Sequence, residues 1–293
     1  METLDGIEIR HERVTGYGGV GLHVVRAGPD RGVPVVLLHG FPEHWISWRR
    51  QIPALARAGF PVLAPDLRGY HLSDKPAAPD AYRLRALVED VAALVRDTGQ
   101  PKAHVVGHDW GGIVAWTFAG EHPELLNKLV ILNAPHLRLY FGKAWRPPQL
   151  LRSWYVLFFR LPGLSERALS AGDFAAVRRM FRDLPARPGA FTAADIDEYV
   201  AALSRPGSLT AGLNYYRANL TPARLRIARA ARTDAETLVL WGDRDPALGV
   251  ELLEGIQRVA PRARVRRLPG VGHWVQNEAP AAVNRALIGF LRG

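Results

Sequence analysis

The stretch AHVVGHDWGGIV, residues 103–114, decides the fold. A short apolar run leads into a turn in which Gly107 and Gly111 stand four residues apart, and an apolar segment of helical length follows. Glycines at this spacing allow the sharp turn that joins a strand to a helix and exposes a nucleophile at its apex. The apex holds Asp109, where serine is the usual occupant. A carboxylate needs no base to activate it, so the sequence raises the question of which reaction uses it.

The composition is that of a globular protein. The chain has 293 residues, 48% of them hydrophobic and 23% charged, which is enough for one large domain or a domain with an insertion. No window approaches 18 uncharged apolar residues, and the N-terminus lacks a basic and then apolar pattern, so we expect neither a membrane span nor a signal peptide. The chain contains no cysteine, which excludes disulfides and cysteine metal sites and fits a cytoplasmic location.

The net charge of +10 raises the question of nucleic-acid binding. Almost all of the excess is arginine, scattered along the chain without a basic run or a reading motif. We therefore expect no nucleic-acid partner.

Short apolar runs alternate with amphipathic stretches along most of the chain. Such runs, rich in β-branched residues, predict strands, and their alternation with helices predicts a parallel sheet covered on both faces. Residues 83–97 and 281–292 read as helices, and residues 7–28 read as an N-terminal hairpin. The six predicted strands are residues 33–38, 61–65, 103–107, 128–133, 237–242 and 264–268.

One interval lacks any buried-strand signal. Between Asn133 and Leu220 the sequence has only helix-like segments, with aromatic residues in WYVLFF and YY. These aromatics fit an ordinary helical insertion and also a lid that lines a pocket. We predict core residues 1–134, a helical cap or lid at 135–220, and the rest of the core at 221–293.

Polar residues cluster just after the predicted strands, where ligands bind in open α/β sheets. The motif HGFP (39–42) follows the first parallel strand, and Asp109 follows the third. Asp243 and Asp245 come after the fifth strand, and His273 comes after the last. The chain therefore contains a nucleophile, an acid and a histidine in that order.

On these residues, the chain resembles the α/β-hydrolase fold family over essentially its whole length. Its motifs HGFPE, GHDWGG, WGDRDP and GVGHWVQNEAP look most like those of the epoxide hydrolases. The resemblance implies a mostly parallel eight-stranded sheet flanked by helices, with an inserted helical cap. It also implies that a small epoxide, alkyl or aryl, and water are the substrates, without a cofactor or a metal.

The resemblance assigns roles to the polar residues. Asp109 would attack the epoxide to form an alkyl-enzyme ester, and His273 would activate the water that hydrolyses it. Asp245 would orient His273, with Asp243 as the alternative. The backbone N–H groups of Phe41 and Trp110 would form the oxyanion hole.

The resemblance also implies that two tyrosines of the cap protonate the leaving oxygen. Tyr155, eight residues before Gly163, and Tyr216, just before Arg217, match the family's positions. For the other cap tyrosines, including Tyr140, we expect an ordinary core role. The predicted substrate-binding side chains are Phe41, Trp110, Trp154 and Phe158.

Other residues and other functions fit parts of this pattern. We expect His108 to pack within the turn, and His39 and His44 to support the oxyanion loop through hydrogen bonds. A haloalkane or haloacid dehalogenase shares the Asp nucleophile, but those enzymes usually carry Asn at the position of Phe41 or Arg at that of Trp110. A non-catalytic ligand-binding relative predicts decay of the triad, which is intact here. The sequence leaves monomer and homodimer open.

Overall fold

The computed structural model describes residues 2–220 and 232–293, and within them a sheet of nine strands in the order β1-β2-β3-β5-β4-β6-β7-β8-β9. Five neighbouring pairs, from β5 to β9, are parallel and three are antiparallel. The strands are β1 Glu2–Leu4, β2 Ile7–Thr15, β3 Gly21–Ala27, β4 Val35–Leu38, β5 Val62–Pro65, β6 Ala103–His108, β7 Leu126–Leu132, β8 Glu236–Gly242 and β9 Ala263–Leu268.

The predicted fold class is confirmed, with one correction to the number of strands. All six predicted strands and the N-terminal hairpin of β2 and β3 are present. The ninth strand is β1, which pairs antiparallel with β2. Its three residues are too few to show an alternating pattern, so the prediction of eight strands missed it.

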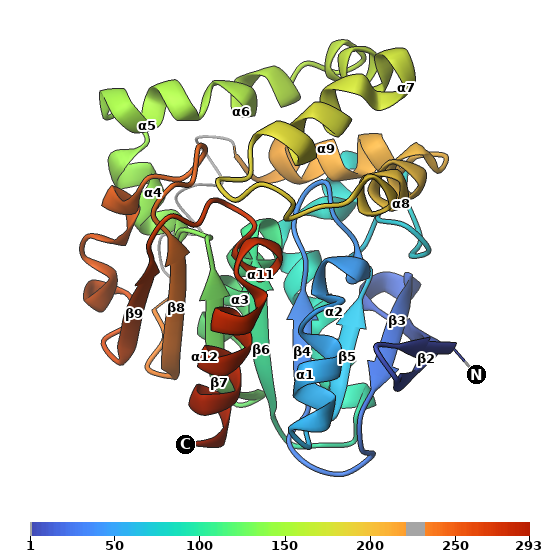
Figure 1. Cartoon of the computed structure of the whole chain (residues 1–293), viewed down its shortest axis with the longest axis vertical. Helices are drawn as coiled ribbons and strands as arrows, with labels where there is room; N and C mark the ends of the chain where they lie inside the picture. Colours follow the sequence, from blue (N-terminus) through green and yellow to red (C-terminus); the bar gives the residue numbers. More distant parts are fainter. Residues whose placement is uncertain (1, 221–231) are drawn as a thin grey trace.

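The sheet carries a hydrophobic core on each face because successive side chains of a strand point to opposite sides. In β4, Val36 and Leu38 belong to the core on one face, whereas Val35 and Leu37 belong to the other. Helices α2 and α3 cover the first face, and α1 and α12 cover the second (Figure 1). The helices and 3-10 turns of the core are η1 Tyr17–Gly19, η2 Trp45–Trp48, α1 Ile52–Arg57, η3 Pro79–Tyr82, α2 Leu84–Asp97, α3 Asp109–Glu121, η4 Val250–Leu253, η5 Ile256–Arg258, α11 Val275–Glu278 and α12 Pro280–Arg292.

In the described part of the chain between β7 and β8, six helices form a layer above the edge where the parallel strands end (Figure 1). They are α4 Leu137–Lys143, α5 Pro147–Arg152, α6 Trp154–Phe159, α7 Leu164–Asp183, α8 Ala193–Ser204 and α9 Ser208–Asn219. We call residues 137–219 the helical insertion. No strand occurs in it, as predicted. The predicted domain boundary after residue 220 adjoins residues 221–231, which lie outside the described part of the chain.

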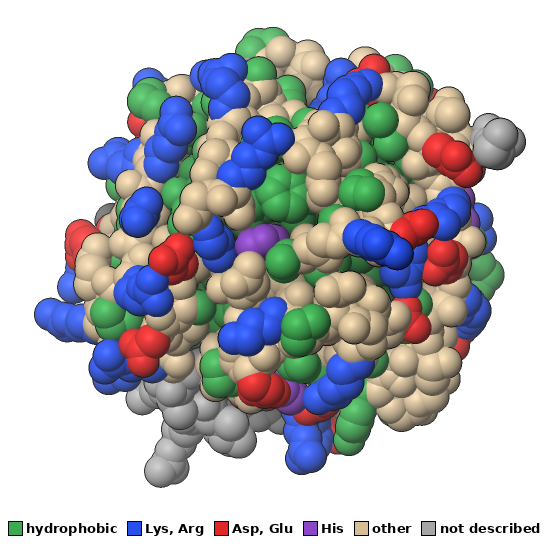
Figure 2. Space-filling model, turned by 90° about the horizontal axis from the view of Figure 1, so that it is seen from below, with side chains coloured by type: hydrophobic (Ala, Val, Ile, Leu, Met, Phe, Trp, Pro, Cys, Tyr) green, Lys and Arg blue, Asp and Glu red, His purple; other side chains and the backbone are tan. Residues whose placement is uncertain are grey.

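The surface view agrees with scattered rather than banded positive charge. On the face seen from below in Figure 1, Lys and Arg side chains lie among acidic, apolar and other residues (Figure 2). Among the described residues, no helix is both long and apolar enough to cross a membrane.

Candidate active site

The turn between β6 and α3 places Asp109 at the edge of the sheet beneath the insertion. Asp109 has a positive φ of 50°, an uncommon conformation for a residue with a side chain. A Cβ atom at Gly111 would come far closer than 3.0 Å to the carbonyl oxygen of Leu38, and one at Gly107 would collide with Gly111. The two glycines therefore let the turn pack directly against neighbouring backbone.

The carboxylate of Asp109 is held by backbone N–H groups. The Phe41 N–H donates to Asp109 Oδ1 at 2.8 Å, and the Trp110 N–H also hydrogen-bonds to the carboxylate. These are the two groups that the sequence predicted as an oxyanion hole. Burial raises the pKa of Asp109 above its ordinary value, although these N–H groups and two nearby histidines oppose the rise.

A histidine and a second carboxylate stand beside Asp109. His273 Nδ1 lies 2.7 Å from Asp245 Oδ2, and His273 Nε2 lies 3.7 Å from Asp109 Oδ2. The alternative acid, Asp243, accepts instead from the N–H of Gly270 at 2.9 Å. The structure thus brings Asp109, His273 and Asp245 together and leaves Asp243 outside.

The two carboxylates control the charge of the histidine. Burial alone lowers the pKa of His273, but the negative charges of Asp245 and Asp109 outweigh burial and raise the pKa to about 9. With both carboxylates ionised, His273 is therefore an imidazolium at neutral pH. Removing either negative charge lowers the His273 pKa and favours the neutral base.

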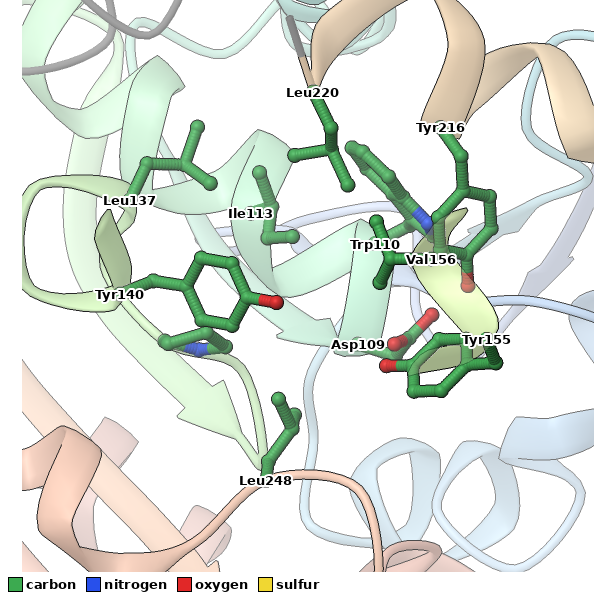
Figure 3. A pocket seen from close by; sticks show the side chains of 11 residues that line it. Asp109, Trp110, Ile113, Leu137, Tyr140, Tyr155, Val156, Tyr216, Leu220 and Leu248 are labelled. Carbon is green, nitrogen blue, oxygen red and sulfur yellow. The ribbon is translucent and has the colours of Figure 1, made fainter. Parts of the chain in front are cut away.

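Two tyrosines of the insertion face the carboxylate from above. Tyr155 comes from α6 and Tyr216 from α9, and both hydroxyl groups point toward Asp109 (Figure 3). Their rings lie 6.2 Å apart and nearly perpendicular. Burial is the main cause that raises the pKa of each phenol well above 10.0, and the negative charge of Asp109 adds to the rise. Both phenols are therefore protonated at neutral pH and can donate a proton.

A small pocket opens over these groups, with about 390 Å³ of empty space including open solvent. The carboxylate of Asp109 lies in the pocket among phenol, indole and aliphatic side chains (Figure 3). Such a lining suits a mostly apolar ligand with a single polar centre. The lining residues are Asp109, Trp110, Ile113, Pro135, Leu137, Tyr140, Tyr155, Val156, Tyr216, Leu220 and Leu248.

Three of the predicted substrate-binding side chains differ from expectation. The Trp154 side chain is 66% exposed and lies outside the pocket, because α6 directs its neighbour Tyr155 inward instead. Phe158 packs against Trp154 and Phe159 rather than lining the pocket. The Phe41 ring is buried against Phe159 and Tyr216, so its contribution at the pocket is the backbone N–H.

Two residues of the site were missed by sequence analysis. Tyr140 lines the pocket and donates to Ser153 Oγ at 2.9 Å, although it was expected to be an ordinary core residue. Asn133 directly follows β7 and donates from Nδ2 to Asp245 Oδ2 at 2.7 Å. Asn133 directly follows a parallel strand, so a search of strand ends extended to β7 would have found it, whereas Tyr140 lies within α4 and carries no such signal.

The flanking histidines have unequal roles. The Leu67 N–H donates to His39 Nε2 at 3.0 Å, and His39 Nδ1 donates to the Gly40 carbonyl, so His39 supports the oxyanion loop as expected. His108 is fully buried, with Glu43 Oε2 2.9 Å from its Nδ1, which agrees with a packing role. The expectation for His44 was wrong. Among the described residues, neither nitrogen of His44 has a hydrogen-bond partner.

The chain is similar to known proteins in sequence and in structure. Residues 33–280 match the family described as alpha/beta hydrolase fold. The chain is 39% identical to the AB hydrolase superfamily protein YfhM of Bacillus subtilis, with 99% of each chain covered. It is 36% identical to Epoxide hydrolase 4 of Mus musculus over 94% of this chain and 77% of the relative. The crystal structure of Epoxide Hydrolase A from Mycobacterium thermoresistibile superimposes with a TM-score of 0.84, at 36% identity and 98% coverage of both chains.

Proposed function

The chain belongs to the α/β-hydrolase fold family, with epoxide hydrolases among its relatives, and we propose that it hydrolyses alkyl or aryl epoxides to vicinal diols. The observation that carries the proposal is the pair of protonated phenols, Tyr155 and Tyr216, which face the carboxylate of Asp109 across the pocket. A carboxylate can attack a saturated carbon, and a phenol can protonate the oxygen that this attack releases. Epoxide opening requires both groups at once.

In the first step, Asp109 Oδ2 attacks a ring carbon and the C–O bond of the epoxide breaks. Oδ2 is the attacking atom because Oδ1 is already held by the Phe41 N–H. The ring oxygen takes a proton from Tyr155 or Tyr216 and becomes a hydroxyl. The products are an alkyl-enzyme ester on Asp109 and a tyrosinate.

Between the two steps, the charge of the site changes. The ester is neutral, so His273 loses one of the two carboxylates that raise its pKa to about 9. The imidazolium can then return a proton to the tyrosinate. This transfer restores the phenol and leaves His273 as the neutral base that the next step requires.

In the second step, His273 Nε2 takes a proton from a water molecule, and the resulting hydroxide attacks the ester carbonyl. The negative charge develops on Oδ1, where the N–H groups of Phe41 and Trp110 stabilise it together with the N-terminus of α3. Asp245 keeps the Nδ1 proton directed away from the water. Collapse of the tetrahedral centre breaks the bond to the alkyl oxygen, which takes the proton of the newly added hydroxyl group, so that the diol leaves and the carboxylate of Asp109 and the imidazolium remain.

In this proposal the helical insertion acts as a cap that supplies the acids and much of the pocket wall. Tyr140, Tyr155, Val156 and Tyr216 come from it, whereas Asp109 comes from the core. The division into core, cap and core at about residues 134 and 220 is part of the same proposal.

The covalent ester gives the test. His273→Gln leaves Asp109 able to attack but removes the base, so the variant incubated with a turned-over epoxide should gain the mass of one substrate. Asp109→Ala, given the same epoxide, should gain none. An unchanged mass in the His273 variant would contradict the two-step scheme.

A substrate panel tests the proposed reaction itself. Alkyl and aryl epoxides should yield diols, and alkyl halides of matched size should yield little halide, because the chain carries Phe41 and Trp110 where dehalogenases usually carry the Asn or Arg that holds the halide. Rapid halide release with no diol from any epoxide would instead assign the protein to the dehalogenases.

A further inference from the structure

A second cluster of polar groups lies away from the pocket, where β3 pairs with β5. Its centre is Asp66, directly after β5, whose side chain is fully buried. His23 of β3 approaches Asp66 Oδ2 through Nδ1 at 2.6 Å, and His71 approaches the same oxygen through Nδ1 at 2.9 Å. The three ligand atoms all lie within 4.8 Å of one another. None of these residues lines the pocket over Asp109.

A third histidine packs against this cluster without using its nitrogens. His44 is 2% exposed, its ring lies 4.5 Å from that of His71, and its Nδ1 is 3.9 Å from Asp66 Oδ1. Among the described residues, neither of its nitrogens has a hydrogen-bond partner. A buried polar group without a partner is costly, and a ligand would remove that cost.

We propose that His23, Asp66 and His71 bind a divalent transition-metal ion such as Zn²⁺, with His44 as a fourth ligand beside them. Two or three imidazoles and one carboxylate form a donor set that suits this class of ion. The site is independent of the proposed epoxide chemistry, in which no metal takes part.

A second layer of contacts supports one of the ligands. His23 Nε2 lies 2.8 Å from His11 Nδ1, and His11 Nε2 lies 3.0 Å from Glu2 Oε2. When a metal takes the lone pair of His23 Nδ1, the ring proton moves to Nε2 and donates to His11. Metal-bound histidines characteristically have such a partner on the other ring nitrogen.

The two histidines that share Asp66 Oδ2 require only local adjustment, whereas His44, which is not among the three residues whose ligand atoms lie within 4.8 Å of one another, must move closer to the ion. Ligand atoms about 2.0–2.1 Å from a tetrahedral zinc ion are roughly 3.3 Å from one another. The distances of 2.6 and 2.9 Å from Asp66 Oδ2 to the two histidines must therefore lengthen by less than roughly 1 Å.

The test is titration of tag-free, chelator-treated protein with ZnCl₂ and CoCl₂, by calorimetry and by the visible absorption of bound Co²⁺. The wild type should bind one ion and should unfold at a higher temperature when Zn²⁺ is present. His71→Asn removes one ligand at a half-buried position whose φ of 39° asparagine tolerates. This variant should lose at least about 10- to 100-fold in affinity, because even the loss of a group that only supports a ligand typically costs that much.

A matched control separates this site from general binding at the surface. His122 also contacts two carboxylates, Glu89 and Glu124, but lies outside the cluster. His122→Asn should bind Zn²⁺ as the wild type does. The proposal is overturned if the wild type binds no ion, if a correctly folded His71→Asn binds equally well, or if His122→Asn is the variant that loses binding.

Discussion

Replacing Asp245 by asparagine should separate the two proposed steps. Asp245 Oδ2 is shared by His273 Nδ1 and Asn133 Nδ2, whereas Oδ1 accepts from the N–H groups of Ala247 and Leu248. In the asparagine variant, the side-chain oxygen keeps the hydrogen bonds from the N–H groups of Ala247 and Leu248, so the NH₂ group faces His273 Nδ1. The imidazole must then accept on Nδ1 and carry its proton on Nε2, the nitrogen that has to take a proton from water.

The size of the effect follows from the charge of the site. The rise of the His273 pKa from 6.5 to about 9 corresponds to roughly 3 kcal/mol, at about 1.4 kcal/mol per unit. Asp245 is the largest of the groups that raise it. Losing most of this stabilisation should slow ester hydrolysis by about 100-fold or more, since about 1.4 kcal/mol is tenfold in rate. Attack by Asp109 should slow much less.

The assay is a single turnover followed by rapid quenching and intact-protein mass spectrometry, which gives the fraction of alkyl-enzyme over time. Asp245→Asn should accumulate the ester under conditions in which the wild type shows little. Asp243→Asn is the matched control, because Asp243 contacts Gly270 rather than His273, and it should behave as the wild type does. Hydrolysis within threefold of the wild-type rate in Asp245→Asn, or equal losses in both variants, would refute the reasoning.

Three further predictions follow from the site. Tyr155→Phe and Tyr216→Phe should each slow alkylation by about 10- to 10,000-fold, and the double variant more, in single-turnover kinetics; a double variant with wild-type rates would remove the phenols from the mechanism. Gly111→Ala should lower the melting temperature and the activity together, because its Cβ would collide with the Leu38 carbonyl; unchanged melting would contradict the close packing of the turn. Alkylation needs the ionised carboxylate of Asp109, whose pKa burial raises above 3.8, so on acidification the alkylation rate should already fall at a pH above 3.8. Because the pKa of the Tyr155 phenol is raised well above 10.0, the rate should show no alkaline loss up to pH 10.0. A pH profile with its acid limb at or below 3.8 would contradict this prediction.

The sheet and the positions of Asp109, Asp245 and His273 were predictable because both follow from local patterns. Apolar β-branched runs marked the parallel strands, and the polar residues just after them are brought to one edge by the fold. The GDRDP motif supplied two candidate acids, and the resemblance favoured Asp245 over Asp243. Only the structure showed which of the two contacts His273, since their spacing of two residues leaves both near the edge.

The side chains of the insertion were harder to assign. In α6 the segment WYVLFF is apolar at every position, so no amphipathic pattern indicates which face is inward. Trp154 and Tyr155 differ by about 100° around a helix axis, and a small rotation of α6 decides which one enters the pocket. The cluster around Asp66 was missed for another reason. It depends on β3 and β5 being neighbours in the sheet, and residues 23 and 66 are far apart in the sequence.

The helical insertion also has a consequence for how this enzyme can change. In the proposed mechanism, phenols and pocket walls from residues 137–219 serve alkylation, whereas groups at the ends of the strands serve ester hydrolysis. Mutations in the insertion can therefore change which molecules react without changing the groups that hydrolyse the ester. Directed evolution confined to the insertion should broaden the substrate range and leave the rate of ester hydrolysis unchanged. Variants with new specificity should therefore still complete the catalytic cycle.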